Sequence, residues 1–512
     1  MPIPVIDLFA GPGGLGEGFS SLTHARDRVF KIKLSIEKEE HAHRTLELRA
    51  FLREFPPGKL PDDYYDYLAK LITREQLFAR HPTEARLAAE EAWFAELGGK
   101  DTPDSKVHDR IHAALGSPKK WILIGGPPCQ AYSLVGRSRI IGGEGIEQYD
   151  NDPRHELYRQ YLRILAVHQP PVFVMENVKG LLSAKVRQEH IFEKMLLDLR
   201  HPVAAMPQTR RVAPRDDLEY RLVPLAAGRG DLLGEFQPKD FVIRTEDYGI
   251  PQARHRIIVL GIRSDLTAKP GALVNSETAT VEDVIGDLPR LRSGLSKEPD
   301  SAEAWRDVVK EIADAGWLNN GAIDQIVCEA IRSAVRRVGS SLNRGGEFVV
   351  ATPQPKRHAE WFGDPKLRGV SNHETRGHIR ADLHRYFFSA VFARELGRSP
   401  LLEDFPKALL PKHQNVADAL KETKFNDRFR VQTANRPATT VVSHIAKDGH
   451  YYIHYDPAQC RSLTVREAAR LQTFPDNYLF EGPRTEQYKQ VGNAVPPLLA
   501  KQIAEIVAEL LA

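Results

Sequence analysis

Apolar and polar positions follow a strand-and-helix pattern over the first fifty residues. The run PVIDLF contains the β-branched Val5 and Ile6 and leads directly into the glycine-rich stretch AGPGGLGEGF. A second run, VFKIKLSIE, ends on Glu37 and precedes the helical pattern HAHRTLELRAFL. A strand, a glycine turn, a helix and a second strand with a terminal acid predict one βαβ unit.

Three further apolar runs predict more strands of the same sheet: WILI, PPVFVMENV and RHRIIVLGIR. The segment LYRQYLRILAVH, between the first two runs, has the spacing of an amphipathic helix. Strands that alternate with helices predict an α/β protein with a Rossmann-like parallel sheet and helices on both of its faces.

Two stretches interrupt this pattern. Residues 44–118 are rich in Ala, Leu, Glu, Arg and Tyr, and we interpret them as a helical insertion. Over residues 266–435 Pro, Gly and Arg are frequent and periodicity is weak, which predicts a separate, smaller, loop-rich domain. Helical patterns return in VREAARLQ, with Thr464 as the expected N-cap, and in VPPLLAKQIAEIVAELL.

The composition is that of a soluble globular protein, with 42% hydrophobic and 27% charged residues. A chain of 512 residues is expected to form two or more domains. No window approaches the roughly 18 apolar residues of a membrane span, and the N-terminal segment lacks the basic start of a signal peptide. We therefore expect a cytoplasmic protein with no membrane partner.

The three cysteines, Cys129, Cys328 and Cys460, lie far apart and none has a CxxC partner. This spacing predicts neither a disulfide framework nor a zinc site, so no metal is expected. Cys129 alone stands in a constrained turn, GGPPCQAYS, directly after WILI. Because prolines restrict the backbone and a thiolate is a strong nucleophile, Cys129 is either an inert buried thiol or a nucleophile.

The glycine turn after the first strand would bring a ligand close to backbone N–H groups and to a helix N-terminus. The turn matches neither the usual GxGxxG fingerprint nor the phosphate loop. Glu37 could accept hydrogen bonds from ribose hydroxyls, which favours a sugar-bearing cofactor without a pyrophosphate over NAD. The alternatives are a merely tight turn and a solvated run of charges at Glu37 and the residues after it.

Charged residues also stand beside the two later strands. Glu176 follows the apolar run VFVM, where desolvation favours the neutral acid and lets it donate a proton. Arg254 and Arg256 alternate just before IIVLGI, where they form either an exposed strand start or a site for a phosphate or base edge. With a thiolate at Cys129, these groups suit attack on C6 of cytosine, protonation at N3 and methylation at C5.

With these residues in place, the chain resembles the bacterial cytosine-5 DNA methyltransferases. Seven blocks carry the resemblance in the family's order: DLFAGPGGLGEGF, the acidic strand end at Glu37, GGPPCQAYS, ENVKGL, QARHRIIVLGIR, RSLTVREAARLQTFPDNY and VGNAVPPLLA. The resemblance assigns residues 1–43, 119–265 and 436–512 to three parts of one catalytic domain. It makes residues 266–435 the target-recognition domain.

The resemblance implies S-adenosylmethionine as the methyl donor. It places the cofactor contacts at Phe9, Gly11, Gly13, Gly14, Leu15, Glu37, Pro127, Asn493 and Val495. Cys129 matches the nucleophile, and Glu176 matches the acid that holds N3 and the exocyclic amine. Arg254 and Arg256 match the paired arginines near the cytosine and its phosphate. The chemistry implies that the target cytosine is flipped out of the duplex, and that elimination frees Cys129 after the C5 proton is lost.

Basic residues cluster between positions 330 and 380, inside the segment matched to the recognition domain. The expected DNA contacts are Gln130, Ser133, Gln252, Arg344, Arg357 and Arg376. The family's aspartate that contacts the cofactor adenine has no single match here. Asp101, Asp104 and Asp109 are the candidates.

The resemblance implies a monomeric enzyme that methylates duplex DNA as the protective partner of a restriction endonuclease. The alternatives are tRNA cytosine-5 methylation on the same fold and a non-catalytic DNA-binding relative. A reductase with a redox cysteine is disfavoured, because no second cysteine lies near Cys129 and no dinucleotide pattern is present. Cys328 and Cys460 are expected to be structural thiols.

Overall fold

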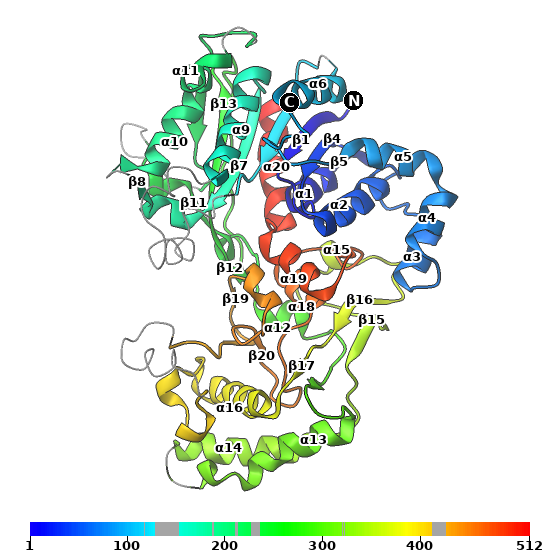
Figure 1. Ribbon diagram of the computed structural model, residues 1–512, viewed down its shortest axis with the longest axis vertical. Helices are drawn as coiled ribbons and strands as arrows, with labels where there is room; N and C mark the ends of the chain where they lie inside the picture. Colours follow the sequence, from blue (N-terminus) through cyan, green and yellow to red (C-terminus); the bar gives the residue numbers. More distant parts are fainter. Residues whose placement is uncertain are drawn as a thin grey trace.

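The structure is a computed structural model that describes residues 1–116, 118–128, 153–186, 189–209, 213–226, 236–319, 321, 323–411 and 426–512. Figure 1 shows two lobes joined by a narrower neck, with both chain ends on the lobe that contains the large sheet. Within the described residues, no helix combines the length and apolar character needed to cross a membrane.

The upper lobe is built on one mixed sheet with the strand order β10-β13-β7-β6-β1-β4-β5, and β11 also pairs with β13. The strands are β1 (Ile3–Leu8), β4 (Phe30–Glu37), β5 (Ala92–Phe94), β6 (Ile122–Gly125), β7 (Val172–Val178), β10 (Tyr220–Val223), β11 (Val242–Arg244) and β13 (His255–Arg263). From β7 to β5 the neighbours pair in parallel, as predicted.

The predicted parallel sheet is confirmed in its central strands, and the structure adds that β13 pairs antiparallel with β7, β10 and β11. A strand that is buried on both faces has the same apolar pattern in either direction, so its direction cannot be read from the run RHRIIVLGIR. The outcome is an α/β fold with an antiparallel edge on a parallel sheet.

Helices cover both faces of the sheet, as the alternating pattern predicts (Figure 1). One face carries α6 (Asp104–Leu115), α9 (Pro153–His168), α10 (Ile191–Arg200) and α11 (Pro202–Ala205). The other face carries α1 (Gly14–Ser21) and α20 (Pro497–Leu511). Alternate strand residues supply the two cores: Leu123 and Phe173 lie in the first, and Ile124 and Val174 in the second.

Residues 44–118 are not purely helical, so that expectation is corrected. They include most of α2 (Glu40–Arg53) and then α3 (Asp62–Leu68), α4 (Arg74–Arg80), α5 (Pro82–Glu91) and α6. They also include β5, which pairs with β4 and forms the edge of the large sheet. Three residues are too few for the alternation of a strand to be recognised in the sequence. For this reason the composition of this stretch predicted helices and did not predict β5.

Over residues 266–435, where a smaller, loop-rich domain is predicted, the structure has several helices between the loops. The helices there are α12 (Val281–Ile285), α13 (Ala302–Lys310), α14 (Gln325–Arg336), α15 (Ala359–Phe362) and α16 (Arg380–Leu396). Trp305, Ile331 and Phe388 belong to one apolar core between α13, α14 and α16. Because α16 is buried among its neighbours, apolar residues surround it and leave no amphipathic period to detect.

The neck contains α18 (Val465–Leu471) and α19 (Arg484–Asn493). The predicted N-cap of α18 is confirmed: Thr464 Oγ1 accepts the N–H of Glu467 at 3.2 Å, and the Glu467 carboxylate accepts the N–H of Thr464 at 2.7 Å. Short strand pairs complete the fold: β2 (Thr23–His24) with β3 (Asp27–Arg28), β8 (Lys185–Val186) with β9 (Glu189–His190), β12 (Gln252–Ala253) with β19 (Ala438–Thr439), β14 (Gly294–Leu295) with β17 (Gly377–His378), β15 (Gly345–Val350) with β16 (Gly369–Glu374), and β18 (Val431–Gln432) with β20 (Ile453–His454).

Candidate active site

The glycine turn lies at the carboxyl end of β1, where open α/β sheets bind their ligands. Three of its residues have a left-handed backbone: Phe9 (φ 56°), Gly11 (φ 57°) and Gly13 (φ 97°). A Cβ placed on Gly11 would meet no atom within 4 Å, so the space beside this residue is open. The backbone at Gly11 can therefore be approached closely by a ligand.

The next residues of the turn pack against the C-terminal part of the chain. A Cβ placed on Gly14 would lie 2.4 Å from the carbonyl oxygen of Val495. Leu15 and Val495 both belong to the core beneath α1 and α20, whereas Asn493 is exposed at the end of α19. Of these four predicted cofactor residues, only Asn493 is open to a ligand in this structure, and the other three contact protein.

Glu37 connects the turn to the end of β4. Its carboxylate accepts the backbone N–H of Gly11 at 2.7 Å, of Lys38 at 2.9 Å and of Glu39 at 2.8 Å. Burial raises the pKa of Glu37, and these three donors act in the opposite direction. A carboxylate can accept about four hydrogen bonds, and the backbone donors occupy three of these positions on Glu37. About one position therefore remains to accept a hydrogen bond from a ligand hydroxyl.

The turn that leads to Cys129 meets the end of β7. A Cβ placed on Gly126 would lie 3.0 Å from Glu176 Oε2, so the start of GGPPC lies against this carboxyl group. Asn177 Nδ2 donates to the carbonyl oxygen of Pro127 at 3.3 Å. Sequence reasoning passed over Asn177, although its place beside Glu176 in the ENV motif was a usable signal.

Cys129, Gln130 and Ser133 lie outside the described residues. The described chain ends at Pro128 in this stretch and continues at residue 153. Pro128, the residue before Cys129 in sequence, lies three residues after the end of β6.

Arg256 forms an ion pair with Glu176, with 3.0 Å between Nε and Oε1. The two residues are diagonal neighbours on the antiparallel strands β13 and β7, because Arg256 lies opposite Val178 and Ile258 lies opposite Glu176. Burial lowers the pKa of Arg256, and the Glu176 carboxylate counteracts this shift. The ion pair fixes the Glu176 side chain next to the cysteine turn.

Arg254 does not share this role. It is 2% exposed, and it donates to the carbonyl oxygens of Val441 at 2.7 Å and Gly492 at 3.2 Å. Burial, followed by the nearby positive charge of Arg256, lowers the pKa of Arg254 well below its usual value. The expectation that the two arginines form one pair facing a ligand is corrected: Arg254 joins the start of β13 to the GNAV segment.

Gln252 is fully buried, and the expectation that it contacts DNA is corrected. Its Oε1 accepts the N–H of Val441 at 2.7 Å, while Nε2 donates to Leu471 O and Gln472 Oε1, both at 3.1 Å. Its side-chain polar groups are thus occupied within the protein. Alternation in sequence could not reveal this, because the partners lie about 190 and 220 residues away.

The expected DNA contacts of the recognition region also bond within the protein. Arg344 donates to Thr375 O at 3.0 Å, and Arg357 pairs with Glu277 at 2.9 Å. Arg376 donates to two backbone carbonyls, Lys447 O and Ile445 O, at 2.9 and 2.7 Å. These three arginines are therefore bonded within the protein, and Glu277, the partner of Arg357, is largely exposed.

A further acid lies near the end of β5. Glu96 is two residues after the last residue of β5, at the same sheet edge as Glu37, and its carboxylate pairs with Lys38 Nζ at 3.1 Å. Of the three predicted candidates, Asp104 pairs with Arg163 at 2.6 Å, and Asp101 and Asp109 are exposed. The strand before Glu96 is only three residues long, so the sequence pattern did not place Glu96 at a strand end.

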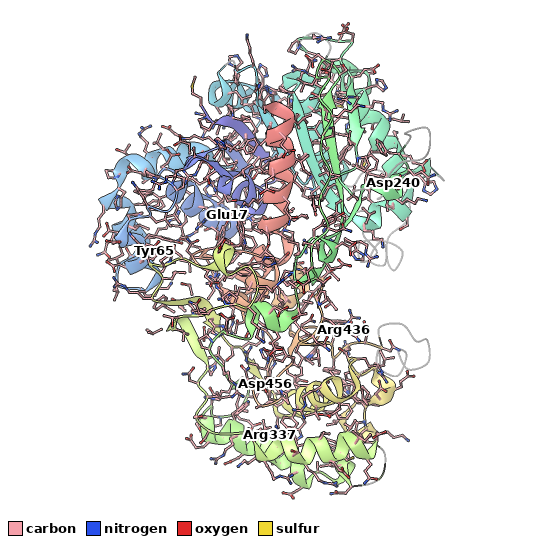
Figure 2. All side chains as sticks on the ribbon, turned by 180° about the vertical axis from the view of Figure 1, so that it is seen from behind. Glu17, Tyr65, Asp240, Arg337, Arg436 and Asp456 are labelled. Atoms are coloured by element: carbon pink, nitrogen blue, oxygen red, sulfur yellow. The ribbon has the colours of Figure 1, made fainter. Side chains whose placement is uncertain are left out.

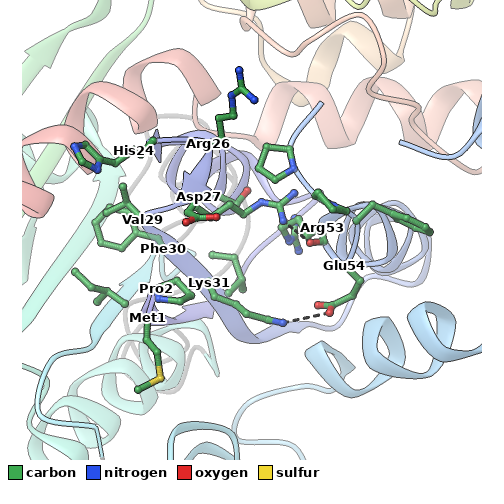
Figure 3. Close-up of a pocket in the computed structure, with 18 of the residues that line it drawn as sticks. Met1, Pro2, His24, Arg26, Asp27, Val29, Phe30, Lys31, Arg53 and Glu54 are labelled. Atoms are coloured by element: carbon green, nitrogen blue, oxygen red, sulfur yellow. Dashed lines mark hydrogen bonds and ion pairs between the residues drawn. The ribbon is translucent and has the colours of Figure 1, made fainter. Parts of the chain in front are cut away.

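A cavity of about 700 Å³ opens elsewhere, at the amino ends of β1 and β4 (Figure 3). It is lined by the start of the chain, the β2–β3 turn and the end of α2, with the ion pair between Lys31 and Glu54 at its margin. It contains none of the predicted site residues. Among the described residues, no group of three His, Cys, Asp or Glu side chains is arranged to hold a metal ion.

The comparison with known families defines a methyltransferase of the cytosine-5 class. The model of the C-5 cytosine-specific DNA methylase family matches residues 102–201 and 233–509, and the chain belongs to this family. It is an enzyme, a DNA (cytosine-5-)-methyltransferase.

The chain is similar to several methyltransferases. The type II methyltransferase M.Bpa9945I of Bacillus paralicheniformis is 32% identical over 99% of this chain and 99% of its own length. The DNA (cytosine-5-)-methyltransferase M.ApeKI of Aeropyrum pernix is 29% identical over 76% of this chain and 81% of its own. A solved E. coli prophage protein, described as a DNA modification methyltransferase, covers 99% of both chains with 18% identity and a TM-score of 0.47.

Proposed function

We propose that this enzyme transfers the methyl group of S-adenosylmethionine to C5 of a flipped cytosine in a specific duplex DNA sequence. The observation that carries the proposal is a convergence at one sheet edge. Glu176, the turn that leads to Cys129, and the Gly11–Glu37 hydrogen bond lie at the ends of β7, β6, β1 and β4. Neighbouring parallel strands present their carboxyl ends together, which is where this fold class binds ligands.

In the proposed reaction the Cys129 thiolate adds to C6 of cytosine and forms an S–C6 bond. The ring electrons move toward C5, which makes C5 nucleophilic, while Glu176 holds N3 and the exocyclic amine. Arg256 keeps the Glu176 carboxyl group in place through their ion pair. After methylation, a base removes the C5 proton, the 5,6 double bond re-forms, and Cys129 leaves as the thiolate.

The residues at the glycine turn fit S-adenosylmethionine, which supplies an electrophilic sulfonium methyl group when bound. Gly11 faces open space, and Glu37 keeps about one free acceptor site, as a ribose hydroxyl requires. We further propose that Glu96, rather than one of the three aspartates, supplies the acidic contact to the adenine. Phe9 and Asn493 remain proposed contacts, and Gly13, Gly14, Leu15, Pro127 and Val495 act by shaping the site.

For the DNA we propose that residues 266–435 form the target-recognition domain. The catalytic domain then comprises residues 1–43, 119–265 and 436–512, together with β5 and its flanking helices. A base must leave the duplex to reach the sheet edge, so the target cytosine is flipped. Gln130 and Ser133 stay proposed contacts near the flipped base, whereas Arg344 and Arg357 are proposed to contact phosphates.

The names of the relatives support a role in restriction-modification, because M.Bpa9945I is described as a type II methyltransferase. We propose that this enzyme acts as a monomer in the bacterial cytoplasm. Its modification would protect sites from a partner restriction endonuclease.

The decisive experiment expresses the chain in a host that lacks DNA methylation and applies bisulfite sequencing to the host genome. We expect 5-methylcytosine in one sequence context, and none with Cys129→Ser. A 5-fluorocytosine oligonucleotide should trap wild-type protein covalently, because elimination of Cys129 requires loss of a proton from C5 and the fluorine in its place cannot leave as a cation. Methyl transfer to tRNA but not to DNA, or binding without a covalent adduct, would overturn the proposal in favour of one of its alternatives.

A further inference from the structure

The helices of residues 60–91, here called the brace, lie between the large sheet and the β15–β16 hairpin (Figure 1). They share an apolar core with α2 and with the segment before α19, which contributes Leu479. Phe348 of β15 and Leu367 pack against the same core from the hairpin side. The brace therefore contacts both the catalytic sheet and the region proposed to recognise DNA.

The first polar anchor of the brace is Glu481, which is 5% exposed. Its carboxylate pairs with Arg74 at 2.6 Å and Arg44 at 3.2 Å, and it accepts the hydroxyl of Tyr67 at 2.7 Å. A buried carboxylate with several charged and polar donors has one geometry in which all are satisfied. This cluster fixes the brace to the segment between α18 and α19.

The second anchor holds the chain between β15 and β16. Tyr65, whose position Figure 2 labels, donates its hydroxyl to Asp364 Oδ2 at 2.8 Å. Lys366 Nζ pairs with Asp62 at 2.7 Å and donates to Leu60 O at 3.0 Å. This anchor joins residues that lie about 300 positions apart in sequence.

The outer surface of the brace does not point to a protein partner. Within residues 60–91, all of which the structure describes, Leu71 is the one large apolar side chain that is strongly exposed. Docking faces present contiguous apolar patches rather than single side chains. The polar and apolar contacts of the brace are instead directed at the hairpin and the neck.

We infer that the brace is a positioning element, which holds the β15–β16 hairpin at a fixed place relative to the catalytic sheet before DNA binds. The inference rests on the proposed function, because the hairpin belongs to the proposed recognition region. Binding is strengthened when the competent arrangement is already populated, since less ordering is needed on association. A variant in which the brace contacts are removed should therefore bind DNA more weakly, with an unchanged cofactor site and an unchanged chemical step.

The kinetic test uses Tyr65→Phe/Lys366→Met, which removes the second anchor and leaves the buried Glu481 cluster intact. We expect KM for DNA to rise about 3- to 10-fold, while kcat and the affinity for S-adenosylmethionine change less than about 2-fold. The matched control is Arg86→Met, which breaks the exposed Arg86–Glu90 pair on α5 and should change none of the three quantities. An unchanged KM for DNA, or an equal loss of cofactor affinity, would overturn the inference.

A charge exchange keeps the test informative if the double variant folds poorly. Lys366→Asp places two carboxylates together and should raise KM for DNA, and adding Asp62→Lys should restore it toward the wild-type value. Rescue would show that the loss arises from the contact between positions 62 and 366 and not from either substitution alone, and absence of rescue counts against the inference.

Hydrogen–deuterium exchange on the DNA-free protein separates the brace from the proposed function. Residues 345–374 should exchange faster in Tyr65→Phe/Lys366→Met than in the wild type or Arg86→Met. Equal exchange in all three proteins refutes the brace whatever the activity. Wild-type protein that methylates no DNA refutes the proposed function while leaving this exchange result valid.

Discussion

Glu37 accepts the backbone N–H of Gly11 at 2.7 Å, across 26 residues of sequence. This bond joins the end of β4 to the glycine turn after β1, so one carboxylate sets the shape of the turn and is also available to a ligand. The two roles predict that the charge of Glu37 matters more than its size.

Glu37→Gln should weaken S-adenosylmethionine binding by about 10- to 100-fold, because hydrogen bonds to a charged acceptor are worth about 1.5–3 kcal/mol. The amide also presents an N–H group to a site where three backbone N–H groups converge. Isothermal titration calorimetry measures the affinity. Glu39→Gln, on an exposed neighbour, should bind within about 2-fold of the wild type; equal losses in both variants would contradict the assignment.

Gly14→Ala should lower the stability of the protein, whereas Gly11→Ala should weaken cofactor binding. At Gly14 the new Cβ would stand 2.4 Å from Val495 O, so we expect a loss of about 1–3 kcal/mol of unfolding free energy from overpacking. At Gly11 the Cβ meets nothing, but it projects into the space proposed for the cofactor, and φ is 57°. Urea unfolding and cofactor titration together distinguish the two. A Gly14→Ala protein of wild-type stability would show that α1 and α20 adjust freely.

Gln252→Ala and Arg357→Ala test the reassignment of the expected DNA contacts. Gln252→Ala leaves the buried Val441 N–H without its partner, which should cost about 1–3 kcal/mol of stability. Arg357→Ala should leave stability within about 0.5 kcal/mol and reduce the salt dependence of DNA binding by about one unit of slope. Unfolding midpoints and binding at several salt concentrations give both quantities. A stable Gln252→Ala protein with altered DNA sequence preference would restore the original interpretation.

The neck should lose stability on acidification because it buries a neutral histidine. In the neutral ring of His373, Nε2 donates to Pro289 O and Nδ1 accepts the hydroxyl of Thr464, both at 2.9 Å, and burial lowers the pKa of His373 to about 4. Between about pH 6.5 and 4 the unfolded chain therefore binds a proton that the folded protein does not, so unfolding free energy falls as pH falls.

The slope contributed by His373 is up to about 1.4 kcal/mol per pH unit in that window. His373→Asn should give a shallower decline of stability from pH 7 to pH 4, even if it is less stable at pH 7. His24→Asn, at an exposed histidine of the β2–β3 turn, should keep the wild-type slope. Denaturant unfolding at several pH values makes the comparison, and identical slopes for His373→Asn and the wild type would contradict the argument.

Local signals in the sequence determined much of the catalytic half of this protein. The strand that ends on Glu37, the glycine turn and the N-cap at Thr464 each depend on residues within a few positions of one another, so spacing alone was enough to predict them. The ordered blocks also identified the family, which the match over residues 102–201 and 233–509 confirms.

Only the tertiary structure determined strand directions and side-chain partners that depend on residues far apart in the sequence. The direction of β13, the strand β5 with Glu96 at its end, and the partners of Gln252 and Arg254 all depend on contacts between distant segments. A glutamine or arginine has the same pattern in sequence whether its donors meet DNA or buried carbonyl groups. Only the fold brings Val441 and Gly492 to Arg254 and leaves Arg256 to hold Glu176, because long-range packing fixes which polar groups each side chain can reach.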